Sequence, residues 1–286
     1  MRVHDHRLLR DDGTPVSYRA SPNHGGVLTP RFLILHYTAG RSAESSIAWL
    51  CNPAARASAH LVIGRDGSVT QLVPFDVAAW HAGASTWYDG ATRITGLNQH
   101  AIGIELDNPG RLQRQGDHWR SLTLGIEYGP SEGIAAVHKH ETKSSGWAVY
   151  PAVQLSAALD VAAALHDAYR LKDIMGHDDV APGRKLDPGP AFPLQSFRGR
   201  VFGRAEDGDI DRWTTTTAVN IRVGPGTQHP TVIPVPLPTG TDVEVHRREG
   251  VWCEVDVLES VSGVNDVQGW VHGRYLRLVE PSRSAV

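Results

Sequence analysis

Two histidines and one aspartate in the sequence have the side chains of a catalytic metal site. His36 follows the apolar run of residues 32–35, and His177 and Asp187 share the glycine- and proline-rich segment 174–193. Two imidazoles and a carboxylate suit Zn²⁺, and three protein ligands leave a position open for water, which is typical of catalytic zinc. Each residue alone also has a plainer explanation: a core histidine for His36, a helix cap for His177 and a turn residue for Asp187.

The hydrophobic pattern predicts the elements that must position these residues. It indicates strands at 31–36 and 101–106, a hairpin at 60–73, and helices at 42–50, with Ser42 as N-cap, and at 154–171. The second helix is the clearest, because its apolar residues recur along one stripe. The charged, glycine-rich stretch 109–151 has no such period and is predicted to be a long loop near the site.

Several short motifs follow one another along residues 28–197. They are Leu35 to Gly40, Ser58 to Ile63, Val73 to Asp76 with Ala79 to Gly83, Ile102 to Leu106, and Gly176 to Gly189. In this order they resemble the zinc-dependent N-acetylmuramoyl-L-alanine amidases of the amidase-2 type, which share their fold with phage lysozyme-amidases and animal peptidoglycan recognition proteins. The resemblance implies an α/β domain with a mixed sheet flanked by helices, and one catalytic Zn²⁺ bound by His36, His177 and Asp187.

The resemblance also assigns roles to two charged residues. Glu105 matches the family's catalytic glutamate, and a carboxylate beside a metal-bound water can take its proton and pass it to the leaving amine. Lys185 and Asp187 are alternate residues of one loop and so point the same way if the loop is extended, which would let the Lys185 ammonium stabilise an oxyanion. The alternatives are a solvated strand-end charge and a plain surface lysine.

Three residues are predicted to line a groove for glycan or peptide: Trp80, His81 and Asn108. Aromatic faces stack on sugars and amides read peptide backbone, although a core position is the alternative for Trp80. In the phage and recognition-protein branches a tyrosine acts from the strand that here reads Ala59-His60-Leu61, and the third ligand is usually cysteine. This chain has no tyrosine there and has Asp187, so it resembles the bacterial glutamate and aspartate branch more closely.

Four other histidines are expected to lie in flexible or solvent-exposed segments and to bind no metal. His4 and His6 are close to the N-terminus, and His138 and His140 fall in the predicted loop 109–151.

The composition changes after residue 200. Residues 201–217 are acidic and threonine-rich, which indicates a linker, and residues 218–286 contain short predicted strands divided by Gly/Pro turns, which indicates a small all-β barrel. The segments 219–226 and 269–272 resemble the opening and closing strands of a bacterial SH3-like domain, a type that commonly binds cell-wall peptide or glycan. Val223 departs from the usual serine or alanine, and a purely structural appendage is the alternative. The predicted catalytic domain is therefore 1–200.

Length, charge and cysteine content limit the class of protein further. The chain has 286 residues, 41% of them hydrophobic, and a formal net charge of −3, so a large core is expected and a nucleic-acid partner is not. Cys51 and Cys253 fall in different predicted domains and provide no disulfide framework.

The sequence contains no recognisable secretory signal and no stretch long enough for membrane insertion, so synthesis in the cytoplasm is expected. The protein would then act on the cell wall after release, as a phage lysin does, or in the cytoplasm on recycled muropeptides.

The predicted function is zinc-dependent hydrolysis of the amide bond between N-acetylmuramic acid and L-alanine in peptidoglycan or muropeptides. One alternative is a module that binds peptidoglycan without cutting it, against which the intact ligand set and Glu105 argue. The other is a zinc peptidase that cuts within the stem peptide, since its metal chemistry would be the same.

Overall fold

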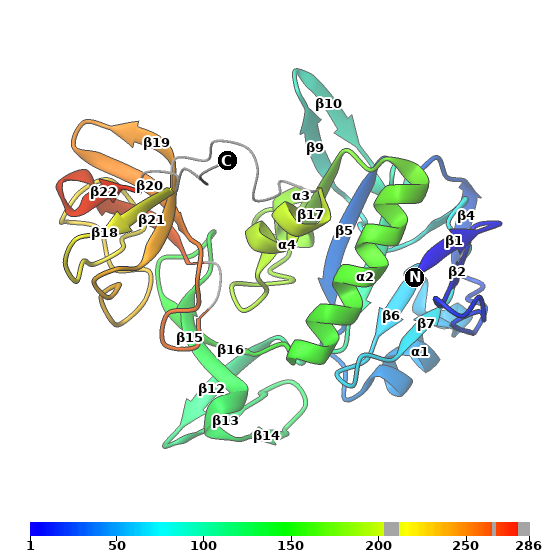
Figure 1. The fold of residues 1–286 in the computed structure, drawn as a ribbon. Coiled ribbons are helices and arrows are strands. Elements are labelled where there is room, and N and C mark those ends of the chain that lie inside the picture. The colour runs from blue at the N-terminus through cyan, green and yellow to red at the C-terminus, as the bar shows by residue number, and fades with distance from the viewer. Residues whose placement is uncertain (203–211, 265–266, 280–286) are drawn as a thin grey trace.

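A six-stranded mixed sheet forms the centre of the protein in the computed structural model, which describes residues 1–202, 212–264 and 267–279 (Figure 1). The strand order is β17-β5-β11-β6-β7-β3, with bounds β3 Ser17–Tyr18, β5 Phe32–Tyr37, β6 Leu61–Ile63, β7 Val69–Gln71, β11 Ala101–Leu106 and β17 Asp173–Gly176. The pairs β17/β5, β5/β11, β11/β6 and β3/β7 are parallel, and β6/β7 is an antiparallel hairpin. The predicted strands and hairpin of this region are confirmed.

Helices cover both faces of the sheet. The long helix α2 (Ala152–Tyr169) lies along one face, where Leu35 belongs to the same core cluster as the apolar stripe of α2 (Figure 1). Helix α1 (Ala43–Leu50) packs on the opposite face, against Val62. Because strand side chains alternate between faces, His36 points away from α2, to the face that carries α1.

Capping explains where the helices begin and end. Ser42 accepts a hydrogen bond from the Ser45 backbone N–H at the start of α1, as predicted. Arg170 adopts a left-handed conformation, with φ of 52°, and so ends α2. The other α-helices of the described residues are α3 (His177–Val180), directly after β17, and α4 (Leu194–Val201), which packs on α2.

The stretch 109–151 is a sheet, so its prediction as a loop is wrong. Its strand order is β14-β13-β12-β16-β15, with β12 Arg111–Gln115, β13 His118–Arg120, β14 Glu127–Tyr128, β15 Gly133–Val137 and β16 Ser144–Ala148. A side chain on Gly133 or Gly146 would run into the Trp119 ring, so the buried Trp119 fills positions at which these strands have no side chain of their own. Because glycine stands where an apolar side chain would be expected, the sequence lacks the alternation of apolar and polar residues that predicts a strand.

The N-terminal residues are likewise ordered and not a flexible end. β1 (Arg2–His4) and β2 (Arg7–Leu9) form a hairpin next to α2, and His6 Nδ1 lies 2.9 Å from the Tyr169 hydroxyl. Two further pairs complete this part of the fold: β4 His24–Val27 with β8 Val77–Ala79, and β9 Thr86–Asp89 with β10 Thr92–Thr95.

The C-terminal sheet is entirely antiparallel and has its own hydrophobic core. Its order is β21-β20-β19-β18-β22, with β18 Arg212–Thr215, β19 Asp242–Glu249, β20 Trp252–Val257, β21 Gln268–His272 and β22 Leu276–Leu278. β18 pairs with both β19 and β22, so residues 212–215 belong to the sheet and not to the linker predicted at 201–217. Residues 203–211 of that linker and residues 280–286 lie outside the described residues.

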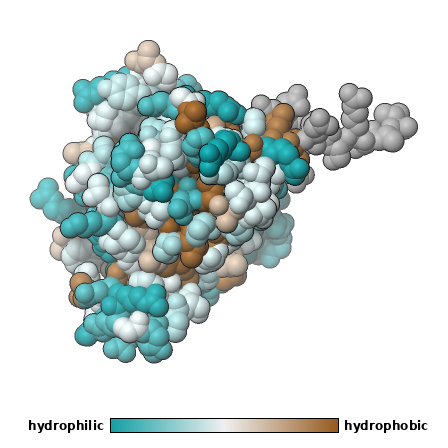
Figure 2. Space-filling view, turned by 90° about the vertical axis from the view of Figure 1, so that its left-hand side faces the viewer, coloured by the Kyte–Doolittle hydropathy of each residue, from teal (hydrophilic) through white to brown (hydrophobic). Residues whose placement is uncertain are grey.

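Seen from the end that carries the C-terminal sheet, the surface is mostly hydrophilic or intermediate, with hydrophobic residues in patches between (Figure 2). Among the described residues, no helix combines the length and the apolar character needed to span a bilayer.

Candidate metal centre

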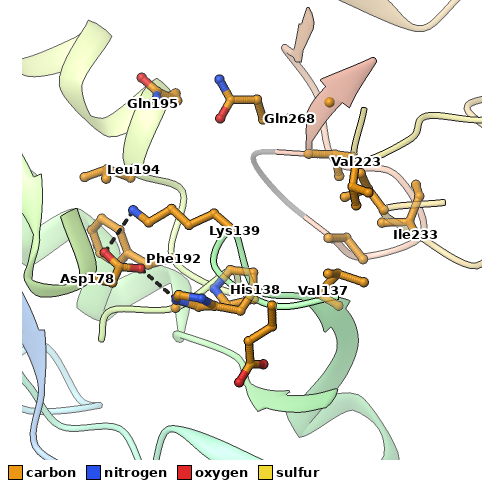
Figure 3. A pocket seen from close by; sticks show the side chains of 18 of the residues that line it. Val137, His138, Lys139, Asp178, Phe192, Leu194, Gln195, Val223, Ile233 and Gln268 are labelled. Atoms are coloured by element: carbon orange, nitrogen blue, oxygen red, sulfur yellow. Dashed lines mark hydrogen bonds and ion pairs between the residues drawn. The ribbon is translucent and has the colours of Figure 1, made fainter. Parts of the chain in front are cut away.

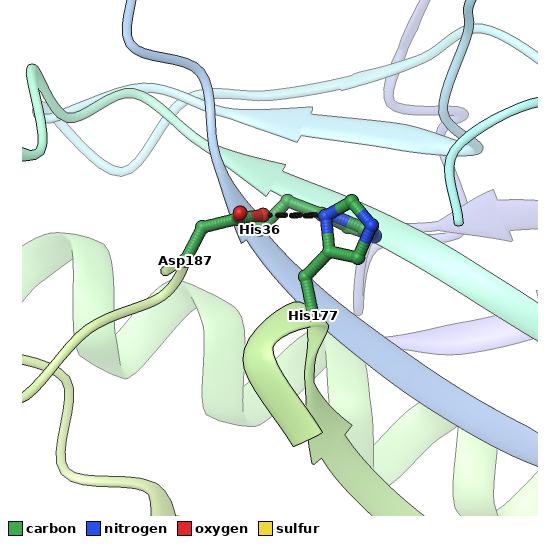
Figure 4. A group of neighbouring side chains, drawn as sticks. All are labelled: His36, His177 and Asp187. Atoms are coloured by element: carbon green, nitrogen blue, oxygen red, sulfur yellow. Dashed lines mark hydrogen bonds and ion pairs between the residues drawn. The ribbon is translucent and has the colours of Figure 1, made fainter. Parts of the chain in front are cut away.

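Three predicted ligands converge at the end of the central sheet (Figure 4). His36 lies near the end of β5, His177 begins α3 after the adjacent strand β17, and Asp187 follows in the next loop. His36 Nδ1 lies 2.9 Å from His177 Nδ1 and 3.0 Å from Asp187 Oδ2, and the last two atoms are 2.8 Å apart. All three side chains are buried, so their positions are set by the surrounding protein and not by solvent.

Hydrogen bonds fix which ring nitrogen of each histidine faces the others. His81 Nε2 donates to the Ala101 carbonyl (3.1 Å), which leaves His81 Nδ1 to accept a hydrogen bond from the N–H of His36 Nε2 (3.0 Å). His177 Nε2 donates to the Ala82 carbonyl (3.2 Å). Since a neutral imidazole carries one N–H, the Nδ1 atoms of His36 and His177 both present lone pairs.

This donor set fits a divalent metal ion. Burial, and next the His177 imidazole, lower the pKa of His36 to about 4. Two lone pairs and a carboxylate oxygen within 3.0 Å of one another repel unless positive charge lies among them. A metal ion requires the deprotonated ligands that this environment favours.

Glu105 lies beside this cluster. It is the parallel register partner of His36, so both side chains lie on the same face of the sheet. Burial, and next the Asp187 carboxylate, raise the pKa of Glu105 to about 8, while Lys185 opposes the rise. Its Oε2 is buried and has no hydrogen-bond partner among the described residues. This oxygen therefore has no role in holding the fold together and is available to accept a proton beside the candidate ligands.

Lys185 is close enough for its charge to act on both His36 and Glu105. Its ammonium lowers the pKa of His36 and that of Glu105. The structure therefore brings together all five residues predicted to carry chemistry.

A comparison with protein families identifies the chain. The model of a family described as N-acetylmuramoyl-L-alanine amidase matches residues 26–190, more than half of the chain, including the three candidate ligands and Glu105. The chain belongs to this amidase family. The matched segment is close to the region 28–197 expected from the motifs, and the reaction named by the family is the predicted hydrolysis of the amide between N-acetylmuramic acid and L-alanine.

Curated relatives agree with this assignment. The N-acetylmuramoyl-L-alanine amidase AmiD of Escherichia coli (strain K12) is 30% identical over 236 residues, which cover 79% of this amidase and 68% of AmiD. The 1,6-anhydro-N-acetylmuramyl-L-alanine amidase AmpD of the same organism is 37% identical over 145 residues, 50% of this chain and 57% of AmpD. This amidase thus spans about two thirds of one relative and little more than half of the other.

A solved structure with similarity to the amidase is E. coli AmiD in complex with the substrate anhydro-N-acetylmuramic acid-L-Ala-D-gamma-Glu-L-Lys. It is 29% identical, covers 66% of this chain and 63% of AmiD, and has a TM-score of 0.43.

Two of the three residues predicted to contact substrate have other tasks in the amidase. Asn108 is 1% exposed and binds the backbone: its amide donates to the Ala148 carbonyl and its oxygen accepts from the Gly110 N–H. His81 uses both ring nitrogens to connect His36 with the Ala101 carbonyl. Trp80 is 38% exposed and remains a predicted substrate contact.

Sequence reasoning missed the residues that hold the candidate ligands in place. Besides His81, Arg184 donates to the carbonyls of Ala82 and Ala84, both at 2.8 Å, and so ties the Ala82 loop to the loop that carries Asp187. His81 and Ala82 lie in the Ala79 to Gly83 motif, but nothing in the motif reveals that the Ala82 carbonyl orients His177.

Gly103→Ala should displace His81 and weaken the metal site. A Cβ at Gly103 would overlap the His81 imidazole, so the ring can bind His36 only if position 103 has no side chain. We expect zinc affinity to fall about 10-fold or more and the free energy of unfolding to fall by about 1–3 kcal/mol, measured by chelator competition and urea denaturation. Gly199→Ala in α4, where an added Cβ meets nothing within 4 Å, should leave zinc affinity unchanged and, because alanine favours a helix over glycine, should not lower the free energy of unfolding. Unchanged zinc affinity in Gly103→Ala would show that His81 does not orient His36.

His60 should make the amidase sensitive to acid. It is fully buried; Nδ1 accepts from the Gly103 N–H and Nε2 donates to the Val77 carbonyl, both at 2.9 Å. Burial lowers its pKa to about 4, although the bond to Val77 opposes this. As the pH falls, His60 of the unfolded chain therefore takes up a proton at a higher pH than His60 of the folded protein. The contribution of neutral His60 to the free energy of unfolding is fully present above about pH 6.5, and up to about 3 kcal/mol of it is lost as the pH falls towards 4.

Urea denaturation of metal-free protein between pH 7 and pH 4.5 would measure this loss. His60→Asn, whose Oδ1 can replace Nδ1 as acceptor, should be less stable than wild type at pH 7 but should lose less on acidification. Equal losses in the two proteins would assign the acid sensitivity to other groups.

Proposed function

We propose that the amidase hydrolyses the bond between the lactyl group of N-acetylmuramic acid and L-alanine with one zinc ion, held by His36, His177 and Asp187. The observation that carries the proposal is the convergence of two oriented Nδ1 atoms and one carboxylate oxygen within 3.0 Å of one another. Two imidazoles and a carboxylate suit zinc better than Mg²⁺ or Ca²⁺, which prefer oxygen ligands. When bound, zinc would polarise the amide carbonyl and make water more acidic.

Glu105 is the proposed general base and acid. It accepts a proton from the attacking water and delivers it to the nitrogen of L-alanine as the carbon–nitrogen bond breaks. The raised pKa of about 8 helps the second transfer, because a weakly acidic carboxyl holds its proton until the amine leaves, and a neighbouring divalent charge helps the first by favouring the carboxylate. Lys185 supplies positive charge near the oxyanion of the tetrahedral intermediate.

Mass analysis of products tests this function. Purified peptidoglycan and soluble anhydromuropeptides would each be incubated with zinc-loaded and with chelated protein. The proposal expects zinc-dependent release of peptides with a free L-alanine amine. Fragments cut within the stem peptide would instead indicate a peptidase, and binding without cleavage would indicate a recognition module.

We further propose that the C-terminal sheet is an SH3-like domain that binds wall peptide or glycan and that begins at residue 212. Its antiparallel strands and separate core support an independent unit. A wall-binding unit favours a wall-directed enzyme, such as a lysin, over one that recycles muropeptides. Co-sedimentation of the full chain with purified cell walls tests this, and absence of binding would contradict it.

A further inference from the structure

The tip of the β15–β16 hairpin reaches the loop that carries two metal ligands. The hairpin tip carries His138, Lys139 and His140; the two histidines were expected in solvent, yet His138 is 1% exposed. His138 Nε2 lies 2.9 Å from Asp178 Oδ2, and Lys139 Nζ lies 2.9 Å from Asp178 Oδ1 (Figure 3). His140 Nε2 binds the Asp178 carbonyl at 2.9 Å. Three consecutive residues of one hairpin thus bind a single aspartate.

The hydrogen-bond directions in this group are fixed. His138 Nδ1 accepts from the His140 backbone N–H, so its Nε2 carries the proton and donates to Asp178. Lys139 also contacts the Asp179 carboxylate at 2.6 Å. Burial alone would lower the pKa of Lys139, but the carboxylates of Asp178 and Asp179 outweigh it, and the lysine stays charged. A carboxylate only 2% exposed, such as Asp178, requires such partners.

Asp178 connects the candidate ligands His177 and Asp187. It directly follows His177 in α3, and its backbone N–H donates to the Asp187 carbonyl at 2.9 Å. Asp179 accepts from the Gly176 N–H on the other side of His177. A shift of Asp178 would therefore move the backbones of His177 and Asp187 relative to each other and to His36 on β5.

We infer that His138, Lys139 and His140 are positioning residues that hold His177 and Asp187 at the separation a metal ion needs. Within the hairpin, the His138 ring stacks on buried Trp147 of β16. From outside, the hairpin is supported by the C-terminal sheet, because Ile134 of β15 packs against the core of that sheet. Beyond Val137 and Lys139, a cavity of about 280 Å³ separates the hairpin from Val223 and Ile233 of the C-terminal part (Figure 3). The inference rests on the proposed zinc site, but its test separates the two.

The test measures zinc affinity by chelator competition, the absorption spectrum of the cobalt-substituted protein, and the melting temperature of metal-free protein. We expect Lys139→Met and His138→Gln each to raise the zinc dissociation constant about 10-fold or more and to alter the cobalt spectrum. Lys139→Arg, which keeps the charge, should recover most of the affinity. Lys143→Met, an exposed lysine of the same hairpin, is the matched control and should leave both unchanged.

The variants separate positioning from mere support of the fold. Lys139 is 39% exposed at its side chain, so Lys139→Met should fold even if His138→Gln does not. A lower melting temperature with unchanged zinc affinity and cobalt spectrum in Lys139→Met would overturn the inference. Wild-type protein that binds no zinc at all would instead refute the proposed metal site.

Discussion

Glu105→Gln should slow amide hydrolysis by about 10²–10⁴-fold while leaving zinc binding intact. The substitution keeps the shape of the side chain but removes its ability to accept a proton. The buried Oε2 of Glu105 has no hydrogen-bond partner among the described residues, and burial raises the pKa of the carboxyl, so the charged form is costly in the folded protein. The variant should therefore be as stable as wild type or more stable, as expected where function and stability conflict.

Three measurements on one preparation test this prediction: the rate of L-alanine amine release, the zinc content and the melting temperature. A lower rate with full zinc content and an undiminished melting temperature would assign the loss to proton transfer. Activity within a few-fold of wild type would show that another group is the base. Zinc loss in Glu105→Gln would indicate that the carboxylate is itself a ligand.

His177→Ala should remove both activity and the stabilisation by zinc. The wild-type protein holds its three donor atoms within 3.0 Å of one another, so an ion that binds them should stabilise the folded state in proportion to its affinity. Loss of one ligand should weaken zinc binding by more than the roughly 10–100-fold typical of residues that only orient ligands. Activity should fall to background.

The measurement is the melting temperature with zinc and with a chelator. Wild type should melt at a higher temperature with zinc and regain activity when zinc is restored after chelation, whereas His177→Ala should show neither effect. His24→Ala, which removes an exposed histidine, should behave as wild type. Chelator-resistant activity in the wild type would contradict the zinc assignment.

Local patterns in the sequence were enough to predict strands β5, β6, β7 and β11 of the central sheet and the chemical types of the site residues, but not the edge strands β3 and β17. The apolar run before His36 lies between two parallel strands and is buried on both faces of the sheet, and such strands leave an uninterrupted hydrophobic signal. The N-cap Ser42 and the turn between β6 and β7 are likewise local features. His36, His177, Asp187, Glu105 and Lys185 could be selected because a zinc hydrolase requires these side chains and the motif order supplied their context.

The way in which those residues are held follows from contacts between segments that are distant in the sequence. The strands of 109–151 escaped prediction because the Trp119 ring of β13 covers glycine positions of β15 and β16, which are not adjacent to β13, and a local pattern does not record such a contact. The burial of His138, the carbonyls of Ala82 and Ala101 that set the imidazole tautomers, and the inward position of Asn108 all depend on contacts between segments distant in sequence. Periodicity reports which residues are buried, but hydrogen-bond partners follow from how the buried segments meet.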